Sequence, residues 1–395
     1  MNTNDIIRLE AASVLPTYAQ LPLALVRGED VWVWDADGNR YLDLYGGHCV
    51  TVLGHCPPKV VQAIQEQAET LLFYSNVVHS PVRAEAAARL AALAPAGMGH
   101  PFLCNSGTEA NETALKLART HTGRAGVIAM EHGFHGRTLG SLAVTAGEGY
   151  RKPHAAVLPG AHFVPFGDAE AVVALLASRD DIGAVILEPI QSLAGMYEAP
   201  AGYFVDLRRI CDAHGVCLIF DEVQTGVGRT GTFSIASQLG VTPDLITLAK
   251  SLGSGVPVGA VLVSNDIASR VEIGDHGSTF GGGMLAMRAM SATLEMLVED
   301  GWMERALLLH DAFRAGLEDL GGTVRGRGCL IGVDFGRPAK PLLAELRQRG
   351  ILAGGASDPN VIRLMPSLTT PLAAVDEFLD TMGEILGVAK EQSLA

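Results

Sequence analysis

Residues 217–231, with the sequence CLIFDEVQTGVGRTG, join a short apolar run to two consecutive acidic residues. Apolar runs of this length, bounded by polar and glycine-rich segments, are typical of strands that are buried on both faces. Similar runs recur along the chain as GVIAM (126–130), GAVILEP (183–189), LITLAK (245–250) and GAVLV (259–263). The stretch therefore predicts one strand of a repeated set, with Asp221 at its carboxyl end.

Helix-like segments separate these runs, for example residues 58–72 and 111–121. Short apolar strands that alternate with helices predict a mostly parallel sheet sandwiched by helices, which is an α/β fold. In such sheets, ligands bind at the carboxyl ends of the strands. The residues that follow the apolar runs are therefore the first candidates for function.

The two ends of the chain have a different pattern. An Asp-Gly turn within residues 30–47 predicts a hairpin, and after residue 285 two amphipathic helices precede short strands and a last helix. We expect an N-terminal segment (1–52) that joins a small α+β domain (285–395), and a large domain between them (53–284).

Composition limits the possible functions. The chain has 395 residues, of which 48% are hydrophobic and 18% charged, and its net charge is −14. This acidic balance argues against nucleic-acid or anionic membrane partners. No run of 18 apolar residues occurs, the start MNTNDIIRLE does not resemble a signal peptide, and the six cysteines form no C-x-x-C pair. We expect a cytoplasmic protein.

Asp221 allows several interpretations. It could simply cap the next element. An acid after an apolar strand also occurs in P-loop ATPases, but the chain has no G-x-x-x-x-G-K-[ST] motif. The pattern Gly226-x-Gly228-x-x-Gly231 matches a dinucleotide fingerprint, yet it does not directly follow a strand. Neither nucleotide interpretation is favoured.

Two further stretches carry candidate binding residues. Ser106, Gly107 and Thr108 precede a helix, where free N–H groups and hydroxyls can bind an anion, although an ordinary N-cap explains them as well. In EHGFHGRT (131–138) the histidines suggest metal ligands, but no further ligand cluster stands nearby, and we expect no metal. Phe134 and Arg137 of the same stretch offer a flat apolar face and a carboxylate-binding guanidinium.

Lys250 ends the apolar run 245–250 and is followed by SLGSGVPVGA. A strand there would carry its amine to the same sheet edge as Asp221. Desolvation lowers the pKa of a lysine and makes it a nucleophile able to form a Schiff base. The alternative is a surface lysine whose charge reaches solvent.

Together these features suit a pyridine aldehyde that carries a phosphate. The ordered motifs SGTEAN, FHGRT, EPIQ, IFDEVQTGVGRTG, LITLAKSLGSGVPVGA and GSTFGGG resemble those of the class III, or acetylornithine/ornithine, aminotransferases, which use pyridoxal 5′-phosphate. The resemblance extends from residue 17 to residue 370. It implies the fold-type I architecture of pyridoxal-phosphate enzymes, and a homodimer with active sites at the subunit interface.

The resemblance also implies roles for individual residues. Lys250 would form the Schiff base and carry the proton during the reaction, and Asp221 would keep the ring nitrogen protonated. The other cofactor-binding residues would be Ser106, Gly107, Thr108, Phe134, Val223, Gln224 and, from the other subunit, Thr279. Arg137 would bind a substrate carboxylate. Arg363 would pair with Glu188, and this pair would open when Arg363 binds a second carboxylate.

The sequence departs from the family pattern at substrate positions. Ser192 and Leu193 replace a Gly-Glu pair, and Met284 follows an extra glycine where relatives have Asn-Pro. His48 stands where isoleucine or tyrosine is common, while Tyr18 matches a tyrosine that contacts ornithine in ornithine aminotransferases. His48 and Tyr18 are therefore candidate substrate-binding residues.

The implied reaction is a ping-pong transfer of the terminal amino group of an N-acylated diamino acid to 2-oxoglutarate. N-acetylornithine is the expected donor, which would fit arginine biosynthesis. Ornithine, 4-aminobutyrate or another ω-amine, or a racemase reaction on the same scaffold, are the alternatives. A protein that binds the cofactor without turnover is the hypothesis from a different class.

Overall fold

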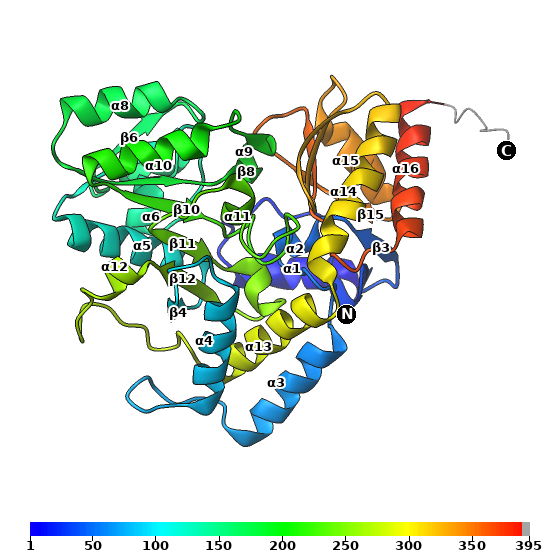
Figure 1. The fold of residues 1–395 in the computed structure, drawn as a ribbon. Helices are drawn as coiled ribbons and strands as arrows, with labels where there is room; N and C mark the ends of the chain where they lie inside the picture. The colour runs from blue at the N-terminus through cyan, green and yellow to red at the C-terminus, as the bar shows by residue number, and fades with distance from the viewer. Residues whose placement is uncertain (389–395) are drawn as a thin grey trace.

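The computed structural model describes residues 1–388, and its main element is a seven-stranded sheet (Figure 1). The strands lie in the order β4 (His100–Cys104), β12 (Gly259–Val263), β11 (Leu245–Leu248), β10 (Cys217–Asp221), β7 (Ile182–Leu187), β5 (Gly126–Met130) and β6 (Ala161–Val164). Only β12 runs antiparallel to its neighbours in this sheet, so the predicted mostly parallel sheet is confirmed.

Both faces of this sheet are covered by helices, as the apolar runs predict. Leu218 of β10 belongs to the core cluster that includes α8 (Ala169–Ser178) and α10 (Tyr203–His214). The next residue, Ile219, belongs to the cluster that includes α5 (Gly107–Thr122). Consecutive side chains of a strand point to opposite faces, so an unbroken apolar run is needed to fill both layers.

The N-terminal segment and the C-terminal third meet in a small sheet. Its strands are β1 (Leu25–Glu29), β2 (Trp32–Asp35), β3 (Arg40–Asp43) and β15 (Ile351–Leu352). The predicted hairpin is present as β2 and β3, and β15 pairs parallel with β3. A second small sheet contains β13 (Thr323–Arg327), β14 (Leu330–Asp334), β17 (Val361–Leu364) and β16 (Gly354–Gly355).

Longer helices complete both parts of the molecule. They are α3 (Pro58–Thr70), α4 (Pro81–Leu93), α13 (Met284–Glu299), α14 (Trp302–Asp319), α15 (Ala339–Gln348) and α16 (Leu372–Leu386). In Figure 1, α13 lies with α3 and α4 beside the large sheet, whereas α14, α15 and α16 cover the C-terminal part. The boundaries at residues 52 and 284 stay a prediction.

The remaining elements are short, apart from α1. They are α1 (Thr3–Ser13), α2 (Gly46–Cys49), α6 (Leu139–Ala143), α7 (Glu148–Arg151), η1 (Lys152–His154), β8 (Ile190–Gln191), α9 (Ser192–Gly195), β9 (Tyr197–Glu198), α11 (Ala236–Leu239), η2 (Lys250–Gly253) and α12 (Asn265–Ala268). Across residues 1–388, we find no helix with the length and apolar character needed to span a membrane.

Candidate active site

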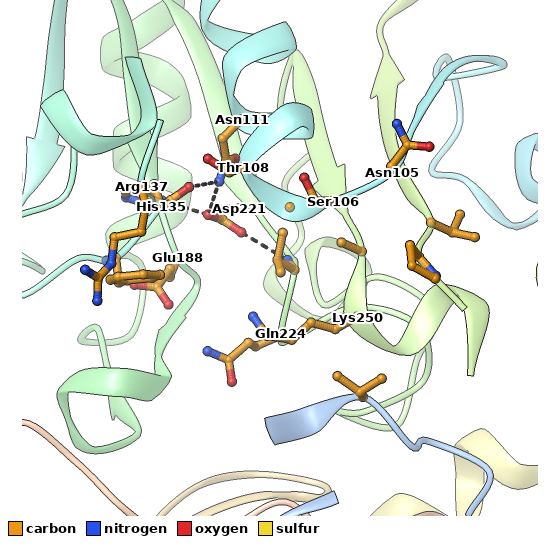
Figure 2. Close-up of a pocket in the computed structure, with 18 of the residues that line it drawn as sticks. Asn105, Ser106, Thr108, Asn111, His135, Arg137, Glu188, Asp221, Gln224 and Lys250 are labelled. Carbon is orange, nitrogen blue, oxygen red and sulfur yellow. Dashed lines mark hydrogen bonds and ion pairs between the residues drawn. The ribbon is translucent and has the colours of Figure 1, made fainter. Parts of the chain in front are cut away.

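A cavity of about 420 Å³ opens at the carboxyl ends of the central strands (Figure 2). Ten of the residues predicted from the sequence line it: Ser106, Gly107, Thr108, Phe134, Arg137, Glu188, Asp221, Val223, Gln224 and Lys250. They come from segments up to 144 positions apart, from 106 to 250. The sheet brings them to one edge, as expected for a site in this class of fold.

Lys250 lies two residues beyond the end of β11, at the start of η2. Its backbone has a positive φ of 41°, which is costly for a residue with a Cβ and is typical of functional sites. The strand is thus shorter than the apolar run suggested, and a sharp turn brings the lysine to the cavity. Burial lowers the pKa of Lys250, although the neighbouring Cys49 and Asp221 act in the opposite direction.

Asp221 is held by a buried hydrogen-bond network. Its Oδ2 accepts hydrogen bonds from Asn111 Nδ2 and His135 Nδ1, both at 2.7 Å. Asn111 is itself oriented by Thr247, whose hydroxyl donates to Asn111 Oδ1 at 2.8 Å. Burial alone would lower the pKa of His135, but the hydrogen bond and charge of Asp221 outweigh burial and raise it. The network therefore fixes the position of the Asp221 carboxylate at the cavity wall.

The start of α5 forms another wall of the cavity. Ser106 is the N-cap, and its hydroxyl accepts the N–H of Glu109 at 3.3 Å. A Cβ on Gly107 would lie 2.9 Å from Val223 Cγ1, so only glycine lets the helix start approach Val223 this closely. The hydroxyl of Thr108 lies 2.8 Å from that of Thr138. Free N–H groups and hydroxyls here suit a phosphate.

These observations fit pyridoxal phosphate. The helix start would hold the phosphate, Val223 beside Gly107 would pack against the ring, and Asp221 would meet the ring nitrogen. Within residues 1–388 no carboxylate forms an ion pair with Lys250, so its amine remains available to the aldehyde. The donor set therefore matches the chemistry of this cofactor.

Glu188 and Arg137 lie close together at one side of the cavity (Figure 2). Glu188 accepts the backbone N–H of Phe134 at 2.9 Å, and burial raises the pKa of Glu188 to about 7. The Arg137 guanidinium stacks 3.9 Å over the ring of Tyr150. The stacking holds the cation in place without neutralising it, so Arg137 can still bind a carboxylate.

Arg363 does not line the cavity, and among the described residues it forms no ion pair with Glu188. The structure therefore does not show the expected direct pair, and the exchange of Glu188 for a carboxylate at Arg363 stays a prediction. Arg363 Nε instead donates to the carbonyl of Gly355 at 2.6 Å, and its Nη1 donates to Ser192 Oγ at 3.3 Å. The strand β17 buries this guanidinium, whose charge still acts on Lys250 and on Glu188.

Three other predicted residues lie outside the cavity lining. His48 has a left-handed backbone (φ 69°) and contacts the hydroxyl of Tyr45 through Nδ1. Burial, together with the charges of Lys250 and Arg363, lowers the pKa of His48 to about 4. Tyr18 is 82% exposed and Thr279 is also exposed. The proposed contribution of Thr279 to a second subunit is not tested by one chain.

Sequence reasoning missed several residues of the site. Asn111 and Thr247 are buried polar residues inside otherwise apolar elements, and that contrast was the available signal. His135 was considered only as a metal ligand, whereas it bonds to Asp221. Tyr45 gave no signal, because its contact with His48 depends on the left-handed turn between them.

The chain was compared with known proteins. Residues 14–386 match the family model described as aminotransferase class-III. The acetylornithine aminotransferase of Methanopyrus kandleri is 46% identical over 323 residues, covering 81% of this chain and 82% of the relative. The corresponding protein of Methanosarcina acetivorans is 41% identical over 391 residues, with 97% and 95% covered.

A solved structure shares the architecture. The ornithine aminotransferase of Toxoplasma gondii, described with pyridoxal phosphate at partial occupancy in its active site, superposes with a TM-score of 0.91. It is 28% identical in sequence, and the match covers 99% of this chain and 95% of that one. The fold predicted from the strand and helix pattern is therefore confirmed.

Proposed function

Because the chain belongs to the class III aminotransferases and is therefore a pyridoxal-phosphate-dependent aminotransferase, we propose that its donor is an N-acylated diamino acid of the ornithine type. The terminal amino group of this donor would pass to 2-oxoglutarate in a ping-pong reaction, giving a semialdehyde and glutamate. The relatives named acetylornithine aminotransferase support N-acetylornithine as the first candidate.

The observation that carries this proposal is the pair of arginines around Lys250. Arg137 lines the cavity, and Arg363 is buried behind Ser192 and still acts on the pKa of Lys250. A dicarboxylate acceptor needs two cationic partners, whereas an N-acylated donor has one carboxylate and an amine at its far end. The site offers one arginine for the carboxylate that donor and acceptor have in common. A second arginine is available for the other carboxylate of the acceptor.

Residues of this chain would perform the individual steps. When bound, pyridoxal phosphate supplies an electron sink that stabilises a carbanion next to the reacting nitrogen. Lys250 would hold and release the cofactor's aldehyde carbon, and its amine would then move a proton from the substrate carbon to that aldehyde carbon. Asp221, with its two hydrogen-bond donors, would keep a positive charge on the ring nitrogen.

Glu188 would regulate access to Arg363. Its raised pKa, about 7, allows it to change charge near neutral pH. With the amino donor bound, an ionised Glu188 would partly neutralise Arg363. With 2-oxoglutarate, the acceptor carboxylate would bind Arg363 directly, after release of its contact with Ser192.

We also propose a homodimer in the cytoplasm, with Thr279 of the partner subunit reaching the phosphate. The resemblance to the family supports this arrangement. Thr279 follows an exposed loop and is accessible in the single chain. Measurement of the molar mass in solution, together with loss of cofactor affinity in Thr279→Ala, tests the shared site.

The donor is tested by half-reactions. The purified enzyme, loaded with pyridoxal phosphate, is mixed with N-acetylornithine, N-succinylornithine, ornithine, 4-aminobutyrate or an N-acyl-lysine, and the visible absorption of the cofactor is followed. We expect the N-acylated ornithines to bleach the band fastest and 2-oxoglutarate to restore it. Faster bleaching by ornithine or 4-aminobutyrate would reject the proposed donor class. No bleaching by any amine would indicate a protein that binds the cofactor without turnover.

A further inference from the structure

Ser192 occupies the space between two functional side chains. Its hydroxyl is fully buried and lies 3.3 Å from Arg363 Nη1 and 3.0 Å from Gln224 Oε1. Arg363 and Gln224 are 2% and 7% exposed. Solvent therefore has little access to these two hydrogen bonds.

The chemistry of the three groups determines which atom donates and which accepts in each hydrogen bond. A guanidinium can only donate hydrogen bonds, so Ser192 Oγ must accept from Arg363. The O–H of Ser192 donates to Gln224 Oε1, so the amide presents its oxygen to the serine. The amide nitrogen of Gln224 is thereby directed away from Ser192, and Gln224 lines the cavity.

Within residues 1–388, Ser192 is the one recorded hydrogen-bond partner of the Gln224 side chain. Without it, the amide could turn and present its oxygen to the cavity. An amide N–H stabilises an anionic oxygen such as the phenolic oxygen of the cofactor, whereas an amide oxygen repels it. The orientation of Gln224 therefore decides whether this side chain supports or opposes negative charge on the cofactor.

We propose that Ser192 is a positioning residue that couples the carboxylate-binding guanidinium of Arg363 to the cofactor's phenolic oxygen through the amide of Gln224. When a substrate carboxylate draws Arg363 away, Ser192 Oγ no longer accepts the hydrogen bond of the guanidinium. The serine hydroxyl then becomes free to rotate. Binding of a carboxylate at the acceptor site would then change the stabilisation of negative charge on the cofactor's phenolic oxygen. This inference rests on the proposed function, because it assigns Arg363 to the acceptor carboxylate.

The test is a pH titration of the visible absorption of the loaded enzyme, with and without glutarate, an unreactive dicarboxylate analogue of 2-oxoglutarate. In Ser192→Ala, the midpoint should rise by about 0.5–1 pH unit, because a hydrogen bond to the anionic oxygen is lost. The other charged or titratable groups near the cavity are Asp221, His135, Glu188, His48, Tyr45, Cys49, Arg137, Lys250 and Arg363, and all are retained in this variant.

Glutarate supplies the readout that a merely structural serine would not affect. In the unsubstituted enzyme it should shift the midpoint, and the affinity for glutarate should depend on pH to the same extent, because coupling is reciprocal. In Ser192→Ala, glutarate should still bind, but its effect on the midpoint should fall at least about threefold. Ser192→Thr keeps the hydroxyl and should retain most of the coupling.

Ser367→Ala is the matched control. Ser367 is also a buried serine near Arg363 in the chain, but its hydroxyl donates to the carbonyl of Val52 at 3.1 Å and does not contact Gln224. It should leave both the midpoint and the glutarate effect unchanged. An unchanged midpoint and an unchanged glutarate effect in Ser192→Ala would overturn the inference. Failure of the proposed function is distinguishable, since it would show as absent bleaching by N-acylated ornithines in the unsubstituted enzyme.

Discussion

The cavity has two walls that are built differently. The cofactor wall consists of Gly107, Asn111, His135 and Asp221. Gly107, Asn111 and Asp221 lie in regular elements, and Asn111, His135 and Asp221 form a closed hydrogen-bond network. What we call the substrate wall is a second layer behind the cavity lining, and it consists of Tyr45, His48, Ser192 and Arg363. Here His48 has a left-handed backbone, Ser192 begins a single helical turn, and contacts cross between distant loops. We propose that the cofactor wall carries the chemistry and that the substrate wall sets selectivity.

Removing the group between the two walls gives the largest expected effect. Lys250→Ala takes away the nucleophile and the proton carrier, so transamination should fall by at least about 10³-fold. The measurement is bleaching of the cofactor band by the best donor, followed by stopped-flow absorbance. Lys340→Ala, at an exposed position, is the control. Turnover in Lys250→Ala close to that of the unsubstituted enzyme would contradict the central assignment.

The cofactor wall should respond strongly to a change of charge. Asp221→Asn keeps the size of the side chain but removes the anion that faces the ring nitrogen, and kcat should fall by about 10²–10³-fold. The same substitution should lower the pKa of His135, since Asp221 is what raises it. NMR titration of the His135 ring checks this shift independently of activity. A small change in kcat, together with a lowered pKa of His135, would show that another group stabilises the positive charge on the cofactor's ring nitrogen.

Much of the cofactor wall is predictable from the sequence because local rules determine it. An apolar strand places Asp221 at the sheet edge, and a serine and glycine before an amphipathic helix identify the anion-binding helix start. Lys250 could be assigned to the same edge, although not to its turn beyond the strand. Asn111 was overlooked because its partner, Asp221, is 110 positions away.

The substrate wall was less predictable for a physical reason. Its contacts depend on positive backbone angles at His48 and Cys49 and on the approach of β17 to α9, and neither has a pattern in the sequence. The resemblance pointed to Glu188 and Arg363 as a pair; both side chains are buried, but no ion pair between them is present in the described residues. The hydroxyl of Ser192, a departure from the family pattern, gives Arg363 another partner.

The charge of Glu188 is the next test of the substrate wall. Glu188→Gln removes the group that would neutralise Arg363 while an amino donor is bound, and it leaves the chemistry of Lys250 in place. The ratio of rates with the N-acylated ornithine and with glutamate as donor should change by about tenfold in favour of glutamate, equivalent to about 1.4 kcal/mol. Steady-state kcat/KM values for both donors provide the measurement. An unchanged ratio would exclude the exchange of Glu188 for substrate at Arg363.

His48 should give the smallest effect, since it contacts Tyr45 and does not line the cavity. His48→Ile, which restores a residue common in relatives, should change the preference between N-acetylornithine and ornithine by about three- to tenfold, as expected for a single altered pocket contact.

Because the pKa of His48 is lowered to about 4, the ring is neutral at pH 7. The folded state disfavours its charged form, so the contribution of His48 to stability is present above its unfolded pKa and is lost as pH falls towards 4. His48→Ile should therefore reduce the loss of Tm between pH 7 and pH 5 relative to the unsubstituted enzyme. An equal loss of Tm in both proteins would mean that the histidine reaches solvent and is not held neutral by the substrate wall.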